Sequence, residues 1–397
     1  MIRFLHTADW QIGMKARHVA PVGDQVRAAR FQTIRRLLQV AVERRADFVV
    51  VAGDVFEDNQ VDNQLIHKLL SILESCPLPI YLLPGNHDPL TPDSVYWRPA
   101  LTANCPANVK VLTTFDPLEP LPGVVLLPAP CYQKKSDLDP TSNWPLISSS
   151  GPKIGLAHGS LMIEGRYQAD DYPIPVQAAQ LRQLDYLALG HWHSLFSPDR
   201  RTFYSGTPEP TGFGETDSGK VLLVTFEGPD AIPQVEPIEV STLVWEQWEY
   251  DLGIGIDELE GRLKQRAGQL AKPENTLLRL SLSGYSSPAT AAKLTEISQW
   301  LKARLLHLDL VTDRLLAQPI TAQLLNQARS QPFLQALLTD LQTTAAVLGE
   351  PLTEIPEDLA GEVEPDQQTL SALIEEGFLP ADVREAMRQV AALVEEV

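Results

Sequence analysis

Cysteine is scarce in this chain, with three residues in 397: Cys76, Cys105 and Cys131. The number is odd and no two of them lie at the spacing of metal ligands, which disfavours a disulfide scaffold and indicates a reducing compartment. The sequence also lacks an apolar run near the ~18 residues of a membrane-spanning helix. Its first residues, MIRFLHTADW, lack the pattern of a signal peptide. We therefore expect a cytoplasmic protein without a membrane segment.

Basic residues are also few relative to acidic ones, 32 Lys and Arg against 51 Asp and Glu. The formal net charge is −19, which argues against a protein that binds polyanions through an overall positive potential. It does not exclude nucleic acid as a substrate, because a local basic strip or bound metal ions can contact phosphate groups. Residues 322–397 contain 14 acidic and 3 basic side chains, a balance of −11 that leaves −8 for the first 321 residues. The N-terminal part is therefore much less acidic than the total suggests.

Short apolar runs alternate with amphipathic stretches over residues 1–240. The runs have strand length and are bounded by Gly, Pro or Asp; they are IRFLH, DFVVVAG, PIYLLPG, GVVLLPAP, KIGLAHG and YLALGH. Apolar residues at helical spacing predict helices over about 26–45 and 63–74, between the first three runs. This alternation predicts an α/β core.

A proline-rich connector, GPDAIPQVEPIEVS at 228–241, follows this core. Beyond it the pattern predicts strand 245–250, helix 257–270, strand 276–283, helix 289–305 and strand 306–312. These elements would form a second, small α/β domain over 241–318. We predict that the remaining residues, 319–397, form an acidic helical region that docks on a partner protein.

Five of the apolar runs end in a polar cluster. The clusters contain Asp9 and Gln11 in HTADWQIG, Asp54 in GDVFE, Asn86, His87 and Asp88 in GNHD, His158 in HG, and His191 and His193 in GHWH. Ligands of α/β proteins collect at the carboxyl ends of strands, and four of the eight histidines fall in these clusters. Carboxylate and amide oxygens combined with imidazole nitrogens suit Mn, Fe or Zn. The five clusters together predict a two-metal site.

The order of these motifs resembles that of the calcineurin-like metallophosphoesterases, D-x-H, GD, GNHD, H and GHxH. LHTADWQIG, GDVFE and GNHDPL are most similar to the SbcD-type DNA-repair nuclease branch, including its YhaO-like members. The resemblance covers residues 1–215, with YSGTPEP at 204–210; residues 241–318 resemble the capping domain of the branch only in length and pattern. It implies an αββα sandwich with a small α/β capping domain and a C-terminal helical tail.

The resemblance also implies a role for each motif residue. Two divalent ions, Mn in the first place with Mg or Fe as alternatives, would share the Asp54 carboxylate. Asp9, Gln11 and His193 would complete the shell of one ion; Asn86, His158 and His191 would complete that of the other. His87 would act as the general acid, oriented by Asp88. This assignment agrees with two-metal chemistry, in which paired cations activate water and clamp the reacting oxygens.

Gln11 departs from the family pattern, which has a histidine at this position. Because a neutral amide oxygen is a poorer donor to a transition metal than imidazole, we predict a weakened first ion site and a shift toward harder ions such as Mn or Mg. Since the other ligands remain, we predict that activity is retained.

The site chemistry predicts phosphodiester hydrolysis without naming the ester. DNA is favoured by the branch resemblance, by the expected capping domain, and by six basic residues against one acid in 15–36. From this strip we predict phosphate contacts by Arg17, Arg27 and Arg30. The leading prediction is thus a DNA exonuclease or endonuclease that acts in DNA repair.

Two alternatives stay open: a small-molecule (cyclic nucleotide) phosphodiesterase, and a weakly catalytic DNA-binding partner of an SbcC-like coiled-coil ATPase. An SbcC-like ATPase and a second copy of the chain are the expected protein partners. Trp10 and Trp192 lie inside motifs, where packing is favoured over stacking on a base. His6 precedes the first motif and is predicted to be a core histidine.

Overall fold

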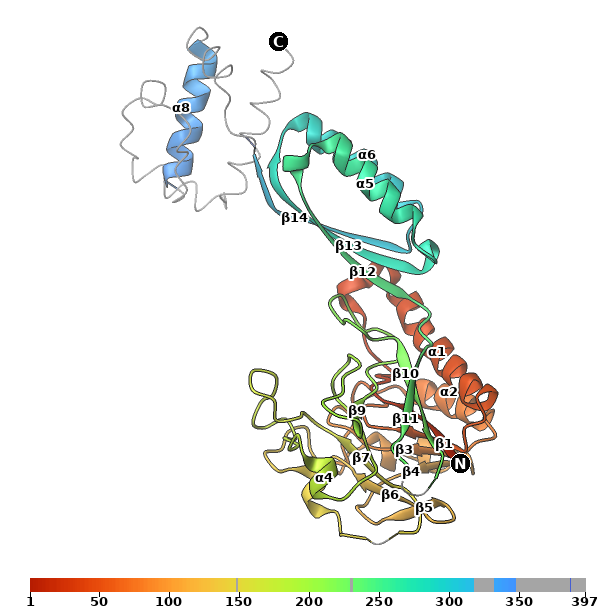
Figure 1. Ribbon diagram of the computed structural model, residues 1–397. Coiled ribbons are helices and arrows are strands. Elements are labelled where there is room, and N and C mark those ends of the chain that lie inside the picture. Colours follow the sequence, from red (N-terminus) through yellow and green to blue (C-terminus); the bar gives the residue numbers. More distant parts are fainter. Residues whose placement is uncertain (148, 229–230, 318–331, 348–385, 387–397) are drawn as a thin grey trace. The chain divides into compact units, whose positions relative to one another are not determined.

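The protein is described by a computed structural model over residues 1–147, 149–228, 231–317, 332–347 and 386 (Figure 1). It divides into two compact units, Met1–Trp245 and Glu246–Val397. The expected boundary at 240–241 lies five residues before this division. Of the expected helical region 319–397, the structure describes helix α8 (Pro332–Val347); the rest of that prediction, including its docking role, lies outside the described residues.

The larger sheet of the first unit has six strands in the order β11-β10-β1-β2-β3-β4. Their bounds are β1 (Ile2–Thr7), β2 (Phe48–Val51), β3 (Ile80–Leu82), β4 (Val109–Val111), β10 (Lys220–Phe226) and β11 (Gln234–Glu239). β1 to β4 run parallel, whereas β10 is antiparallel to β1. The carboxyl ends of the parallel strands therefore lie at one edge.

The second sheet of this unit has five strands in the order β5-β6-β7-β8-β9. Their bounds are β5 (Leu118–Leu121), β6 (Val124–Ala129), β7 (Lys153–His158), β8 (Tyr186–Gly190) and β9 (Thr202–Tyr204). β6 to β9 are parallel, and β5 is antiparallel to β6. The carboxyl ends of these parallel strands also lie at one edge of the sheet.

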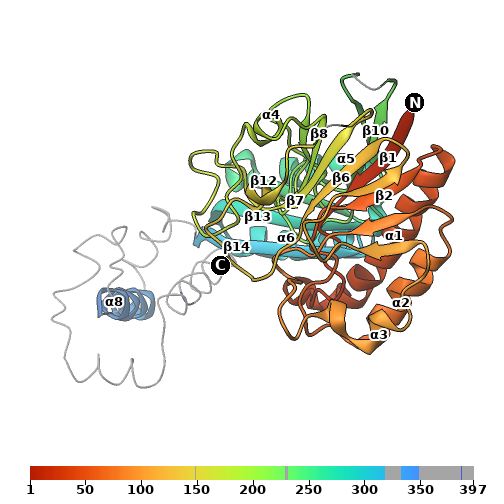
Figure 2. The ribbon, with the colours of Figure 1, turned by 90° about the horizontal axis from the view of Figure 1, so that it is seen from below.

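Alternating side chains of β1 and β2 belong to two different cores, because successive residues of a strand point to opposite faces. Leu5 and Val51 pack in a cluster with helices α1 (Gly23–Glu43) and α2 (Asn63–Glu74). Phe4 and Val50 pack in a second cluster with apolar residues of β6, β7 and β8, between the two sheets. Figure 2 shows α1 and α2 on one side of the strands.

The outer face of the second sheet is covered by a third core. Leu127, Ala157 and Leu189 pack there with Trp144 and with the short helix α4 (Ala178–Leu181). The layers are thus helix, sheet, sheet and helix, which confirms the predicted αββα sandwich. None of the helices in the described ranges is both long and apolar enough to cross a lipid bilayer.

His6 joins the two sheets and is confirmed as a core histidine. Its ring is fully buried, with Nδ1 2.9 Å from the Tyr186 hydroxyl and Nε2 3.2 Å from the Leu189 carbonyl oxygen. Burial lowers the pKa of His6 to about 3, because no carboxylate stabilises the charged ring.

In the second unit a three-stranded sheet of order β12-β13-β14 packs against helices of the same unit. The elements are β12 (Val244–Asp251), α5 (Ile256–Gly268), β13 (Thr276–Ser286), α6 (Pro288–Lys302) and β14 (His307–Ala317). Leu263 of α5, Ile297 of α6 and Leu280 of β13 share one buried core. Ser287 caps α6 by accepting a 3.1 Å bond from the Thr290 amide, as is usual at helix N-termini.

Candidate metal centre

The polar clusters meet where the carboxyl ends of the two sheets adjoin. Asp9 and Asp54 follow β1 and β2, Asn86 follows β3, His158 ends β7, and His191 follows β8. Parallel strands deliver these side chains to one edge, as the sequence predicts. The residues predicted to be metal ligands are therefore brought together from both sheets.

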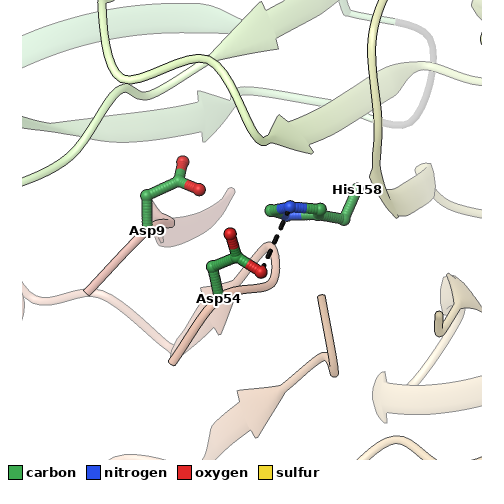
Figure 3. Close-up of side chains that lie close together, drawn as sticks. All are labelled: Asp9, Asp54 and His158. Atoms are coloured by element: carbon green, nitrogen blue, oxygen red, sulfur yellow. Dashed lines mark ion pairs between the residues drawn. The ribbon is translucent and has the colours of Figure 1, made fainter. Parts of the chain in front are cut away.

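Asp9, Asp54 and His158 form the centre of the site (Figure 3). Their ligand atoms all lie within 4.8 Å of one another, and His158 Nε2 is 3.3 Å from Asp54 Oδ1. All three side chains are almost completely buried, at 0–2% exposure. Two buried carboxylates this close repel each other, so the arrangement favours a cation between them.

The acid–base properties of these residues reflect that crowding. Burial raises the pKa of Asp9 above its ordinary value. Burial opposes the ionisation of Asp54 too, but His158 outweighs it and the pKa of Asp54 is lowered. Burial alone would lower the pKa of His158, but the Asp54 and Asp9 carboxylates raise it to about 9. The negative potential of these two carboxylates, which keeps a proton on His158, would also attract a divalent cation.

The backbone of the metal loops is held in unusual conformations. φ is 54° at Asp9, 45° at Gln11 and 51° at Asp54, in the left-handed region that non-glycine residues rarely adopt. The two loops are joined by hydrogen bonds from the Asp9 amide to Gly53 O (3.1 Å) and from the Gln11 amide to Asp54 O (2.9 Å). A Cβ at Gly53 would lie 2.1 Å from His158 Nδ1. Strain of this kind persists where the surroundings enforce it, as they do around functional sites.

Asn86, His158 and His191 direct their ligand atoms at one point. Asn86 Oδ1 is 2.8 Å from His158 Nε2 and 3.1 Å from His191 Nδ1. His158 Nδ1 lies 2.8 Å from the Ala52 carbonyl oxygen, which can only accept, so Nδ1 carries the proton. This leaves Nε2 as the nitrogen that a cation would bind.

Gln11 reaches the other side of the centre. Its Nε2 lies 2.9 Å from His193 Nε2, and a half-turn of the amide group would present the oxygen instead. His193 Nδ1 lies 2.7 Å from Glu215 Oε1 and donates its proton there, which again leaves Nε2 for a cation. The side chain of Gln11 therefore faces His193 at the centre of the site.

Two carboxylates bond to the outer nitrogens of His191 and His193. They belong to no recognised motif, and they were not predicted from the sequence. His191 Nε2 lies 2.6 Å from Asp171 Oδ2, and His193 Nδ1 lies 2.7 Å from Glu215 Oε1. Burial alone would raise the pKa of both acids, but the histidines outweigh it and lower the pKa of each. Carboxylates in this position orient metal-binding imidazoles and strengthen their donation. Asp171 and Glu215 lie in loops, where nothing in the local sequence marks them.

His87 lies at the rim of the centre, half-buried. Its amide donates a 3.0 Å bond to Asp54 Oδ1, and its Nδ1 lies 3.0 Å from the Glu57 carbonyl oxygen. The expected contact between Asp88 and this ring is therefore corrected: the carbonyl of Glu57 orients the ring.

Asp88 instead holds the backbone of the loop. The fully buried carboxylate accepts bonds from the Gly85 amide (2.7 Å), the Phe56 amide (2.9 Å) and the Tyr96 hydroxyl (2.7 Å). Burial raises the pKa of Asp88 to about 6. Since both oxygens are engaged in these bonds, the side chain fixes the loop that carries Asn86 and His87.

The three arginines predicted to contact phosphate differ in their surroundings. Arg17 is exposed, and Arg27 is half-buried and bonded to Asp24 and to the Lys15 carbonyl oxygen. Arg30 is 2% exposed and donates from Nη1 to the Trp10 carbonyl oxygen at 2.8 Å. The prediction is wrong for Arg30, because its guanidinium supports the first metal loop from the interior and is inaccessible to a polymer.

The assembled donors fit divalent cations. Buried carboxylate oxygens, one amide oxygen and imidazole nitrogens are the mixture that transition metals and Mn accept, and each histidine has its second nitrogen anchored by a carbonyl or a carboxylate. Trp10 contributes packing, as predicted: it is 1% exposed, and its indole donates to Thr7 Oγ1 at 3.0 Å.

Comparison with known proteins finds a family match for the N-terminal part of the chain. The family model described as calcineurin-like phosphoesterase matches residues 2–195. The chain is similar to the uncharacterized metallophosphoesterase YhaO of Bacillus subtilis (strain 168), with 25% identity over 245 residues, 57% of this chain and 58% of that protein. It is also similar to the D subunit of nuclease SbcCD from Escherichia coli (strain K12), with 24% identity over 278 residues, 57% of this chain and 65% of that protein.

The D subunit of nuclease SbcCD from Bacillus subtilis (strain 168) is 26% identical over 270 residues, 57% of this chain and 67% of that protein. The chain thus spans about three-fifths of the length of the first two relatives. The family match ends just after the GHWH motif, so it includes every predicted metal ligand. Residues 2–195 of this chain form a calcineurin-like phosphoesterase domain.

Proposed function

We propose that this chain is a two-metal-dependent phosphodiester hydrolase that acts on DNA, as an exonuclease or endonuclease in DNA repair. One observation carries the proposal. Asn86 Oδ1 lies within 3.1 Å of both His158 Nε2 and His191 Nδ1, next to the mutually adjacent Asp9 and Asp54 carboxylates. Such a convergence of oxygen and nitrogen donors is what a pair of divalent ions requires.

Divalent ions held by these ligands would acidify the attacking water and neutralise charge on the phosphate oxygens. The chain's own contribution is positioning and proton transfer. With Nδ1 bonded to the Glu57 carbonyl oxygen, the imidazolium of His87 has Nε2–H as the proton it can give away. Water attacks phosphorus and releases a proton to solvent, the bond to the leaving oxygen breaks, and that oxygen takes the proton from His87 Nε2.

DNA is favoured over other phosphodiesters by two lines of support. Relatives named as a subunit of nuclease SbcCD and as DNA double-strand break repair protein Mre11 match this chain, the latter at 33% identity over 90 residues, 22% of this chain and 14% of that protein. The exposed side chains of Lys15, Arg17, Arg35 and Arg36 supply positive charge after the first motif. They can neutralise phosphates along a strand, with Arg27 as a further candidate.

The same relatives support an SbcC-like ATPase as a partner, since the D subunit is named as part of SbcCD. We include that partner, a homodimer and Mn as the resident ion in the proposal. The binding of a purified SbcC-like ATPase by the full chain tests the first, and sedimentation of the chain alone tests the second.

A digestion assay tests the activity. The full chain is incubated with Mn and labelled linear duplex, labelled single strand, a generic phosphodiester and a cyclic nucleotide. We expect metal-dependent cleavage of DNA that Asp54→Ala abolishes and His87→Ala strongly reduces. Turnover of the cyclic nucleotide much faster than DNA would establish the small-molecule alternative instead. DNA binding without metal-dependent cleavage would establish the weakly catalytic partner of an ATPase.

A further inference from the structure

A buried carboxylate outside the metal centre binds the chain segment that leads into β12. Glu209 lies in the loop between β9 and β10 and is 1% exposed. We propose that Glu209 is a positioning residue that sets the ion affinity of one half of the centre. That half, the Gln11 half, contains Asp9, Gln11 and His193. The inference rests on the proposed function and adds to it a residue that is not itself a metal ligand.

The Glu209 carboxylate accepts three hydrogen bonds from two distant segments. Oε2 accepts from the Thr242 amide at 2.7 Å and from the Thr33 hydroxyl, and Oε1 accepts from the Leu243 amide at 3.0 Å. Thr33 belongs to α1, whereas Thr242 and Leu243 directly precede β12. Because both oxygens are engaged by donors, loss of the charge would leave buried amides without a partner. Glu209 therefore joins its own loop to α1 and to the connector before β12.

The loop that carries Glu209 also bonds the backbone of two predicted ligands. The Thr207 hydroxyl bonds the carbonyl oxygens of Asp9 at 2.9 Å and of Glu209 at 2.8 Å, and the Thr207 amide donates to the His193 carbonyl oxygen at 3.0 Å. Over residues 205–211, which the structure describes in full, every hydrogen bond to a predicted ligand goes to Asp9 or His193. The support that this loop provides is therefore one-sided.

The residues after Glu209 extend the same support. Arg30, which holds the first metal loop, donates from Nη2 to the Pro210 carbonyl oxygen at 3.5 Å. The Thr211 amide donates to Glu215 Oε2 at 2.7 Å, and Glu215 Oε1 lies 2.7 Å from His193 Nδ1. The loop thus contributes to the position of the His193 ring as well as to that of its backbone.

A change in this support is expected to change ion affinity. Asp9 and Gln11 have φ of 54° and 45°, and such backbone conformations persist only where the surroundings enforce them. Groups that orient metal ligands from outside typically alter metal affinity 10–100-fold (roughly) when removed. Since Glu209 binds both the loop and the connector, an ion in the Gln11 half should in turn stabilise the connector, because coupling between two sites is reciprocal.

Glu209→Gln tests the positioning role in the full chain. The variant keeps the size of the side chain but replaces one accepting oxygen by an amino group that faces a donor. We expect the Thr242 and Leu243 amides to exchange hydrogen about tenfold faster in the presence of a chelator. In the wild type, Mn should slow their exchange, and Glu209→Gln should remove this response. Exchange of the two amides that is unchanged by the substitution overturns the inference.

The affinity of each ion gives the second measurement. Two-site Mn titrations followed by electron paramagnetic resonance should show the ion of the Gln11 half about tenfold weaker in Glu209→Gln. The ion bound by Asn86, His158 and His191 should be unchanged. Equal weakening of both ions, or faster amide exchange with both affinities unchanged, overturns the inference.

The Mn dependence of hydrolysis separates positioning from a general structural role. With a generic phosphodiester, Glu209→Gln should need about tenfold more Mn for half-maximal rate and should recover the wild-type rate at saturating Mn. A residue that only stabilises the fold would lower the rate at every Mn concentration and leave the midpoint unchanged. That second result overturns the inference.

Two further variants serve as a control and as a milder test. Asp185 accepts a 2.9 Å bond from the Lys153 amide, at the opposite end of β7 from His158. Asp185→Asn should lower the free energy of unfolding without changing either Mn affinity. Thr33→Val removes only the hydroxyl that bonds Glu209; it should shift the Gln11 half in the same direction by a smaller factor, and it replaces Glu209→Gln if that variant does not fold.

The outcomes distinguish this inference from the proposed function. Two bound Mn ions whose affinities are unaffected by Glu209→Gln overturn the positioning role alone. One-sided weakening without Mn-dependent hydrolysis of any phosphodiester overturns the hydrolase proposal alone. Absence of Mn binding by the wild type overturns both.

Discussion

We expect the two halves of the candidate metal centre to share Asp54 and to differ in their other ligands. The Asn86 half contains Asn86, His158 and His191; the Gln11 half contains Asp9, Gln11 and His193. In the first, the amide oxygen of Asn86 lies 2.8 Å and 3.1 Å from two imidazole nitrogens. In the second, the amide nitrogen of Gln11 lies 2.9 Å from His193 Nε2.

The fold supports the GHWH histidine of each half in the same way. Each has a histidine of the GHWH motif whose outer nitrogen bonds a carboxylate, Asp171 in the Asn86 half and Glu215 in the Gln11 half. The expected difference in ion affinity therefore comes from the other ligands, a carboxylate (Asp9) and an amide (Gln11) in one half, an amide (Asn86) and an imidazole (His158) in the other. Substitutions in one half, in both or in neither test whether the two halves bind their ions independently.

The largest effect is expected from the substitution of Asp54, which would bind both ions. Asp54→Ala removes the shared carboxylate, so both ions should be lost and the rate should fall on the order of 10³-fold or more, since the ions supply several kcal/mol of transition-state stabilisation. Calorimetric titration with Mn should show binding at both sites weakened together. Asp93→Ala, which removes an exposed acid of a neighbouring loop, should leave both measurements unchanged. A variant that loses only one ion would show that Asp54 does not bridge.

A smaller effect, on the affinity of one ion only, is expected from each of the two carboxylates that bond the GHWH histidines. Asp171→Asn and Glu215→Gln keep a hydrogen-bond acceptor but remove the charge, and each should weaken one ion about 10–100-fold. Asp171→Asn should weaken the ion of the Asn86 half, and Glu215→Gln that of the Gln11 half. Two-site Mn titrations followed by electron paramagnetic resonance can resolve which ion is affected. Equal weakening of both ions by either variant would contradict independent halves.

Gln11→His should make the halves more alike. Imidazole in place of the amide should raise Mn affinity of the weaker site by about tenfold and favour softer ions over Mg. The measurement is the Mn and Mg dependence of hydrolysis together with calorimetric affinity. Gln25→His adds a histidine at an exposed position of α1 and serves as the control. If affinity and rate match those of the parent chain within error, position 11 is not a ligand.

The smallest effect concerns a buried histidine outside both halves. His158 beside carboxylates has its pKa raised, whereas His6 without one has its pKa lowered to about 3. The unfolded chain therefore binds more protons at His6 than the folded chain between about pH 3 and the ordinary value near 6.5. The stability that neutral His6 permits is present above pH 6.5 and is lost as pH falls through this window.

At pH 5.5 this loss should reach about 1 kcal/mol, because each pKa unit is worth about 1.36 kcal/mol. Urea unfolding in the presence of a chelator measures it at pH 7.5 and pH 5.5. His6→Gln should show a shallower fall in unfolding free energy than the wild type, whereas His67→Gln, at an exposed position, should not. An unchanged slope in His6→Gln would contradict the lowered pKa.

Two predictions, for Arg30 and for the partner of His87, were wrong for different physical reasons. Arg30 belongs to the basic strip, yet it lies four and seven residues before Ile34 and Leu37, which are buried on the inner face of α1. Helical spacing places Arg30 on that same face, so its burial could have been predicted. The partner of the His87 ring could not, because the Glu57 carbonyl that binds it belongs to the backbone and leaves no trace in the sequence.

The strands that precede the polar clusters, and the residues that lie together at the candidate metal centre, could be predicted from the amino-acid sequence. Each ligand follows directly after an apolar run, and strand alternation with parallel pairing leads such residues to one edge. The loops that lie behind these residues could be identified only in the three-dimensional structure. Asp171 and Glu215 pair with histidines 20 and 22 residues away, and Glu209 binds backbone amides 33 and 34 residues away. Loops have no periodicity, so contacts between them depend on the packing of the two sheets that carry them.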